Sequence, residues 1–271
     1  AGQEVSRKRR ASAKEISGST TAGVKSPVAA IFIKEWKLLL RNPVYMLNGL
    51  IGPLIGPLIL VFMLFTQNQA EETKELFSLL QNPEYGIYVS LGILALMLFT
   101  GGINVVPATS ISREGTTFWI SQTIPVSPRR QTAAKLLQSF SISAAAILVA
   151  GAVILIFFKF PVMQVVLPVA LGMMGSIALS AVGLITDIIH PKLEWTTPQQ
   201  AMKQNLNGLL GMLATLVLMV FLGAVSAGLM FLKVKYWLLM LVLAVVILIL
   251  IFPCLSVLFA LAEKRYNEIE V

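Results

Sequence analysis

The chain has 271 residues, of which 56% are hydrophobic and only 13% are charged, and its formal net charge is +8. Soluble domains carry about 25% charged residues, so this composition excludes a water-soluble globular protein. The single cysteine, Cys254, excludes an intrachain disulfide, and together with the single His190 it argues against a metal site built on thiolates or histidines.

Residues 1–26 contain six Lys or Arg side chains among Ser, Thr, Gly and Ala, which is typical of a flexible basic linker. A basic cytoplasmic flank of a membrane domain is favoured over a nucleic-acid-binding arm. The stretch 18–26 superficially resembles a phosphate-binding loop, but Val24 separates Gly23 from Lys25 and no apolar strand precedes it. Because no nucleotide-binding or catalytic motif appears elsewhere, we expect a protein that is not an enzyme and holds no cofactor.

An amphipathic helix is predicted over 28–41, starting at Ser26-Pro27 and ending before Asn42-Pro43. At 100° per residue its three cations, Lys34, Lys37 and Arg41, fall in one narrow sector, and apolar residues occupy most of the rest. This pattern favours a helix that lies in the cytoplasmic membrane interface. The alternative is that the segment simply begins the next membrane span, but Pro43 favours a break.

Six apolar blocks follow, each long enough to cross a hydrocarbon core of about 30 Å as a helix. The sequence therefore predicts an all-α integral membrane protein, with an interfacial helix before a six-helix transmembrane domain over 27–262 and a cytoplasmic tail over 263–271. A short helix is also expected around 70–81, in an acidic loop. The predicted spans are 44–65, 88–108, 138–158, 162–186, 207–232 and 236–262.

The basic residues predict the orientation of these spans. With six spans, 17 of the 21 Lys and Arg residues fall on the side that holds both termini, and four fall on the other side. Because cytoplasmic loops carry the excess of Lys and Arg, we expect a multi-pass protein of the cell membrane with both termini in the cytoplasm.

The predicted spans are nearly free of charged residues. Asp187, at the cytoplasmic end of the fourth span, is the nearest candidate for an intramembrane carboxylate, and its simpler interpretation is a boundary residue near His190 and Lys192. Ion-driven carriers usually keep ionisable side chains within the membrane, so this pattern argues against such a carrier. The Gly-Pro pairs at 52–53 and 56–57 predict close helix packing and a kink in the first span.

The longest patterned loops lie on the cytoplasmic side and carry three motifs. These are Lys34-Glu35-Trp36-Lys37 with Arg41-Asn42-Pro43; Ser112-Arg113-Glu114-Gly115 with Phe118-Trp119 and Pro125-Val-Ser-Pro128; and Asp187 with Pro191-Lys192-Leu193-Glu194-Trp195 and the stretch 203–207. In this order the chain resembles the transmembrane (permease) subunits of type-2-class ATP-binding-cassette (ABC) exporters. It is most similar to the C-terminal half of large bacterial permeases with two similar halves, and the resemblance covers about 27–262.

The resemblance implies an exporter that takes its energy from a separate ATPase subunit. The helix 28–41, with Lys34, Glu35, Trp36, Lys37 and Arg41, would be an interfacial elbow helix. The loop 109–135 would touch the ATPase, which binds the ATP, through Arg113, Glu114 and Arg129 as contacts and Phe118 and Trp119 as anchors. The implied partners are the ATPase, the other permease half or a second copy, and the bilayer, but no nucleic acid. No role follows for 187–207.

Two other functions stay open at this point: an ion-driven secondary carrier, and a non-transporting membrane protein such as an immunity or scaffold factor. Charge-poor spans argue against the first, and long patterned cytoplasmic loops argue weakly against the second. No motif identifies a transported substrate.

Overall fold

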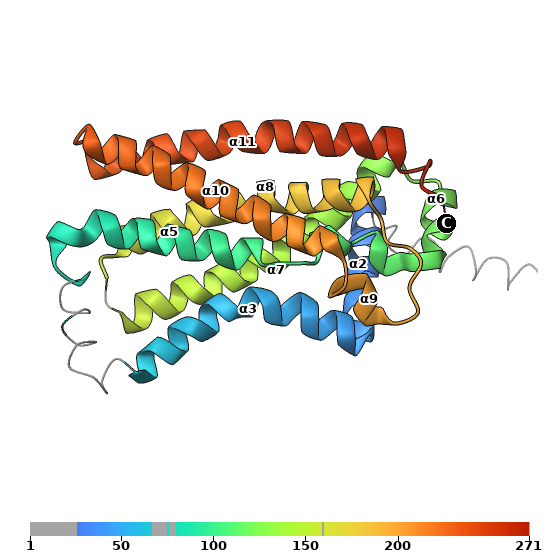
Figure 1. The fold of residues 1–271 in the computed structure, drawn as a ribbon, viewed down its shortest axis with the longest axis horizontal. Helices are drawn as coiled ribbons and strands as arrows, with labels where there is room; N and C mark the ends of the chain where they lie inside the picture. The colour runs from blue at the N-terminus through green and yellow to red at the C-terminus, as the bar shows by residue number, and fades with distance from the viewer. Residues whose placement is uncertain (1–25, 67–74, 76–79, 159, 271) are drawn as a thin grey trace, which may run out of the picture.

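The structure is a computed structural model that describes residues 26–66, 75, 80–158 and 160–270 (Figure 1). The predicted linker over 1–26 lies outside the described residues except for its last position, and so does most of the helix expected around 70–81.

Within the described part of the chain, six helices are long and apolar enough to cross a membrane, and no strand is present, which confirms the predicted fold class. They run side by side along the long axis of the molecule (Figure 1). They are α3 (Pro43–Thr66), α5 (Gly86–Gly102), α7 (Pro128–Phe157), α8 (Val162–Ile189), α10 (Leu206–Phe231) and α11 (Tyr236–Arg265).

Shorter helices gather at one end of this bundle, which we call the α2 end (Figure 1). They are α2 (Pro27–Arg41), α6 (Phe118–Thr123) and α9 (Pro198–Met202), with the 3-10 turns η2 (Pro107–Thr109) and η3 (Ser112–Thr117); a further turn, η1 (Pro83–Tyr85), precedes α5. The connections 103–127 and 190–205, which hold two of the sequence motifs, therefore lie together at the α2 end.

Helix α2 is separate from α3, as the sequence predicts. The Ser26 side chain accepts a hydrogen bond from the Ala29 backbone N–H at 3.2 Å, and Pro27 occupies the first turn, where a missing N–H costs nothing. Asn42 takes an extended conformation after Arg41, and its side chain accepts from the Val44 N–H at 3.0 Å. The chain thus ends one helix and starts the next at Asn42-Pro43.

Helix α8 lies at the centre of the bundle and contacts α5, α7, α10 and α11. Buried apolar side chains fill the spaces between α8 and its neighbours. Met97 of α5 and Ile147 of α7 belong to one buried cluster beside α8. Leu171 of α8 and Leu243 of α11 belong to a second cluster, which also includes side chains of α10. The outer faces of α10 and α11 remain apolar and exposed, as expected for helices that face lipid.

Two helix boundaries differ from the predicted spans by more than three residues. Helix α7 begins at Pro128, ten residues before the predicted span, because polar residues such as Lys135 continue the helix even though they lower its hydropathy. Helix α5 ends at Gly102 rather than 108. There the Asn104 side chain accepts from the Val106 N–H and donates to Ser139 O, both at 3.0 Å, which turns the chain towards α7.

The Gly-Pro pairs of α3 allow close packing on α5. A Cβ atom at Gly52 would lie 3.3 Å from the Ile103 carbonyl, and a Cβ at Gly56 would clash with the Thr100 side chain. Pro53 and Pro57 lie inside α3, and Figure 1 shows that this helix bends. The predicted kink and close approach are therefore both present.

Candidate functional site

A buried group of charged side chains joins three elements at the α2 end. It consists of Lys34 and Glu35 from α2, Arg113 and Glu114 from η3, and Lys135 from α7; we call it the charge cluster. Four of the five side chains are buried, and only Lys34 reaches the surface. Buried charges are tolerated only when they are paired and hydrogen-bonded, so this arrangement depends on every partner being present.

Lys135 is the centre of the charge cluster. Its Nζ lies 2.7 Å from Glu35 Oε1 and 2.5 Å from Glu114 Oε1, and it also donates to the Ser110 carbonyl at 3.3 Å. These three contacts use all three ammonium protons. Lys135 thereby holds α2 and η3 against the first turns of α7.

Glu114 is satisfied at both carboxylate oxygens. Oε1 pairs with Lys135 and, at 2.9 Å, with Lys34, while Oε2 accepts from the Ser121 hydroxyl of α6 at 2.5 Å. Lys34 also donates to Ser121 at 3.0 Å. Helix α6 is thus tied to α2 and α7 through one carboxylate.

Arg113 lies deeper and is less completely satisfied. Its Nε donates to the Thr109 carbonyl at 3.2 Å, and its Nη2 lies 3.5 Å from Gln138 Oε1 and 3.9 Å from Glu35 Oε2. Its Nη1 has no hydrogen-bond partner, although the residue is only 1% exposed. Arg113 therefore retains an unused hydrogen-bond donor.

Asp187 is fully buried at the end of α8 and links the connection 103–127 to the start of α10. Its Oδ2 accepts the backbone N–H groups of Ile111 and Ser112 at 2.5 and 3.2 Å, and its Oδ1 accepts the Ser112 hydroxyl at 2.5 Å and the Asn207 amide at 3.2 Å. The Ser112 hydroxyl in turn accepts the Lys192 N–H at 2.9 Å. One carboxylate thus joins η3, α8 and α10, and we call this group the Asp187 knot.

Asp187 lies at the end of its span, as the boundary interpretation expects. No described contact joins its carboxylate to the side chain of His190 or Lys192; its side-chain partners are Ser112 and Asn207. The carboxylate therefore also organises the connections at this boundary.

Trp195 explains why a glycine follows Arg113-Glu114. Gly115 has φ +55°, which side chains rarely adopt, and a Cβ there would lie 2.8 Å from the Trp195 ring. The indole Nε1 donates to the Ser112 carbonyl at 2.8 Å, and Tyr45 packs edge-on against the ring. Trp195, in the connection 190–205, therefore packs over η3, in the connection 103–127. The segment 187–207 thus has a structural role.

Helix α6 is also anchored to the end of α11. Phe118 packs against Tyr266 with ring centroids 4.9 Å apart, and Gln122 donates to the carbonyls of Tyr266 and Ile269. The Tyr266 hydroxyl donates to Gln131 Oε1 at 3.0 Å. Burial raises the pKa of the Tyr266 phenol above its ordinary value, so this donor stays protonated at neutral pH.

The expected ATPase contacts divide into two groups. Arg113, Glu114 and Phe118 are buried, so in this conformation they hold the connection together and present almost no side-chain surface to a protein partner, in contrast to the expectation. Their charges are paired within the chain instead. Trp119 is 55% exposed, and the exposed side chain of Arg129 lies over the Phe259 ring and 3.8 Å from Glu263.

The residues of the expected interfacial helix also divide. Lys34, Lys37 and Arg41 are exposed, and Trp36 is half-buried. Glu35 is fully buried because it pairs with Lys135, which lies 100 positions later in the chain. The face of α2 that turns inward thus carries a charge as well as the apolar Ile31 and Leu39.

The sequence alone does not reveal the central position of Lys135, which falls in the predicted loop 109–135. A signal was present: Gln131, Lys135, Gln138 and Ser139 recur at helical spacing and continue into buried Ile142, so they mark one inward face of α7. Within the residues described, no group of three or more His, Cys, Asp or Glu side chains could hold a metal ion.

The fold and this site define a multi-pass helical membrane protein with a charge-linked assembly at one end. The chain belongs to the family described as "Membrane protein of 12 TMs", which it matches over residues 3–263. No curated protein and no solved structure matched it.

Proposed function

We propose that this chain is the permease half of an ABC-type exporter that is driven by a separate ATPase subunit docking at the α2 end. The family is described by twelve membrane spans, whereas the described residues contain six candidate spans. A second six-span unit, either another half of a longer chain or a second copy, would bring the total to twelve spans. Together the two units would enclose the pathway for a substrate that nothing here identifies.

The observation that carries the proposal is the set of bonds made by residues 112–123. This segment contains η3 and α6, and we call it the coupling segment. Glu114 and Ser121 bind it to α2 and α7, Ser112 binds it to α8 through Asp187, and Phe118 and Gln122 bind it to the end of α11. A displacement of the coupling segment would therefore be transmitted to α2, α7, α8 and α11 through short, buried contacts.

The coupling segment also presents an exposed surface to which an ATPase could bind. Trp119 and Ile120 are 55% and 48% exposed, although Phe118 and Ser121 on the other side of the short helix are buried. Exposed aromatic side chains held on a rigid support are typical anchors of protein interfaces. Arg129 and Arg130 lie exposed at the start of α7 and add positive charge to the same connection.

Other interpretations of the chain receive less support. Helices α3, α5 and α10 contain no charged residue, and the charges of α7, α8 and α11 lie in their turns at the α2 end, so the described spans offer no chain of ionisable groups across a membrane. A scaffold or immunity protein would not need a coupling segment bonded to so many spans. We therefore propose transport powered from outside the chain, with ATP bound by the partner and the α2 end in the cytoplasm, where an ATPase resides.

Photo-crosslinking in native membranes tests this proposal. A photoreactive amino acid is placed at Trp119 or Ile120, and at Phe231, which is 89% exposed at the other end of the bundle, as the control. We expect positions 119 and 120, but not 231, to capture a protein that binds and hydrolyses ATP. Crosslinks to lipid alone would show that α6 rests on the membrane surface, and they would contradict the proposal.

A further inference from the structure

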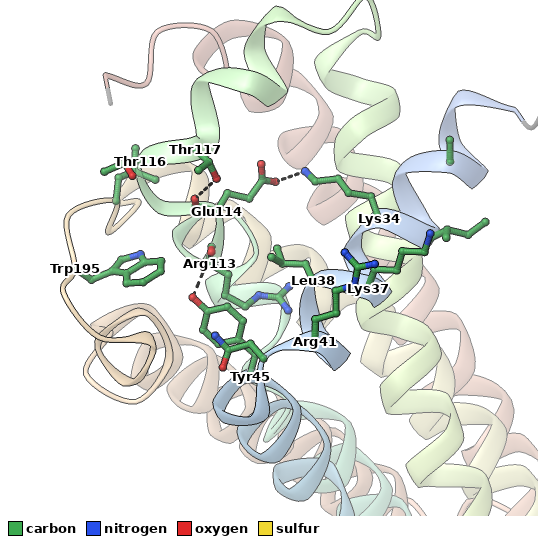
Figure 2. A pocket seen from close by; sticks show the side chains of 14 residues that line it. Lys34, Lys37, Leu38, Arg41, Tyr45, Arg113, Glu114, Thr116, Thr117 and Trp195 are labelled. Carbon is green, nitrogen blue, oxygen red and sulfur yellow. Dashed lines mark hydrogen bonds and ion pairs between the residues drawn. The ribbon is translucent and has the colours of Figure 1, made fainter.

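A cavity of about 630 Å³ opens at the α2 end between α2, the start of α3, η3 and the Trp195 connection (Figure 2). Four cationic side chains and one carboxylate, Glu114, line it, and the buried carboxylate of Glu35, which does not line the cavity, pairs with two of these cations. The cations are Lys34, Lys37, Arg41 and Arg113. Such an excess of positive charge in one concave site favours an anionic occupant.

The fold places these cations together in two ways. Lys34, Lys37 and Arg41 follow one another at the spacing of a single helix face, and the structure turns that face of α2 towards the cavity. Arg113 reaches the cavity from η3, and Figure 2 shows its guanidinium extending towards Leu38 and Arg41. Residues 72 to 79 positions apart in the chain therefore contribute charge to one site.

Two of these four cations have no counter-charge among the residues that the structure describes. Lys34 pairs with Glu35 and Glu114, and Arg113 lies 3.9 Å from Glu35, but no described ion pair involves Lys37 or Arg41. Arg113 is almost completely buried, and its Nη1 has no hydrogen-bond partner. A buried, unpartnered guanidinium nitrogen is costly, and an acceptor bound in the adjoining cavity would remove that cost.

We propose that this cavity binds a phosphate group. Guanidinium groups form paired hydrogen bonds with phosphate oxygens, and ammonium groups add point charges, so two arginines and two lysines suit this ligand. The Thr116 side chain and the Trp195 ring on the opposite wall would contact the remainder of the molecule (Figure 2). This site is separate from the proposed ATPase surface around Trp119 and does not depend on it.

The position of the cavity indicates that a lipid headgroup is the main source of the phosphate. The cavity adjoins the junction of α2 and α3, where Leu40 and Leu47 are exposed and apolar. Basic side chains at the edge of an apolar belt attract anionic lipid headgroups. A soluble phosphate compound would use the same cations, so the experiment must distinguish these two sources.

Binding by the purified full chain tests the proposal. The ligand is a short-chain phosphatidylglycerol, titrated by calorimetry in a neutral detergent, with inorganic phosphate as competitor and a short-chain uncharged diacylglycerol as the headgroup-free probe. The test variant is Lys37→Gln/Arg41→Gln. The matched control is Lys203→Gln/Lys264→Gln, which removes two exposed positive charges that do not line the cavity.

We expect the test variant to bind phosphatidylglycerol at least about tenfold more weakly than the wild type, since it loses two of the four cations that line the cavity. The control should bind as the wild type does, and diacylglycerol should not bind in the site. Weak competition by inorganic phosphate would support a lipid source, and competition at similar concentrations would support a soluble source. Unchanged binding by the test variant, or equal losses in both variants, would overturn the proposal.

Discussion

Replacing Lys135 with methionine should strongly destabilise the protein. The change removes the ammonium that lies 2.7 Å from Glu35 and 2.5 Å from Glu114, while methionine keeps most of the side-chain volume. Removing one partner of a buried ion pair costs about 3–5 kcal/mol, because the other charge is left without compensation.

The remaining contacts place this variant near the lower limit. Glu114 keeps Lys34 at 2.9 Å, and Glu35 keeps Lys34 at 3.4 Å and Arg113 at 3.9 Å. We therefore expect a loss of about 3 kcal/mol, measured as the free energy of unfolding in detergent by denaturant titration.

Two further variants test the reasoning behind this value. Lys203→Met removes an exposed lysine and should change the free energy of unfolding by less than about 0.5 kcal/mol. Lys135→Met/Glu114→Gln removes one of the carboxylates left behind and should recover part of the loss. If Lys135→Met is no more harmful than Lys203→Met, or if the double variant is less stable than the single one, the charge cluster does not hold these elements together.

Three other predictions concern the coupling segment and its support. Asp187→Asn should lower the free energy of unfolding by about 2–3 kcal/mol, because an amide cannot replace a carboxylate that accepts from Ile111, Ser112 and Asn207; an unchanged melting temperature would contradict the Asp187 knot. Gly115→Ala should cost about 1–3 kcal/mol through its positive φ and the Trp195 ring, whereas Gly223→Ala, with open space around it, should be nearly neutral; equal melting temperatures would refute this account. Trp119→Ala should leave stability within about 0.5 kcal/mol of the wild type because the ring is exposed, and co-purification of the ATPase should fall; a large drop in melting temperature would instead indicate a structural role.

The apolar blocks of the sequence predict the membrane helices because lipid imposes both their length and their composition. They predict the limits of those helices less well where polar residues continue a helix beyond the membrane. Helix α7 shows this, since its first ten residues include Arg129, Arg130 and Lys135. Hydropathy reports what surrounds a residue and says little about whether its backbone is helical.

The charge cluster could not be assembled from the sequence, because its pairs join distant positions. Glu35 and Lys135 are 100 residues apart, and Ser112 and Asp187 are 75 apart. Charged residues between spans are normally exposed, so Arg113 and Glu114 were expected at the surface. The pattern Ser-Arg-Glu-Gly lies in η3 and contains two members of the charge cluster, but its glycine is required by Trp195, which lies in a different connection.

ATP hydrolysis measured on the purified chain and on the complex captured through position 120 tests the central claim most directly. The account predicts no hydrolysis by the chain alone, hydrolysis by the complex, and reduced hydrolysis when Trp119→Ala weakens docking. Hydrolysis by the chain alone, or a complex whose ATPase activity and assembly are unaffected by Trp119→Ala, would contradict it.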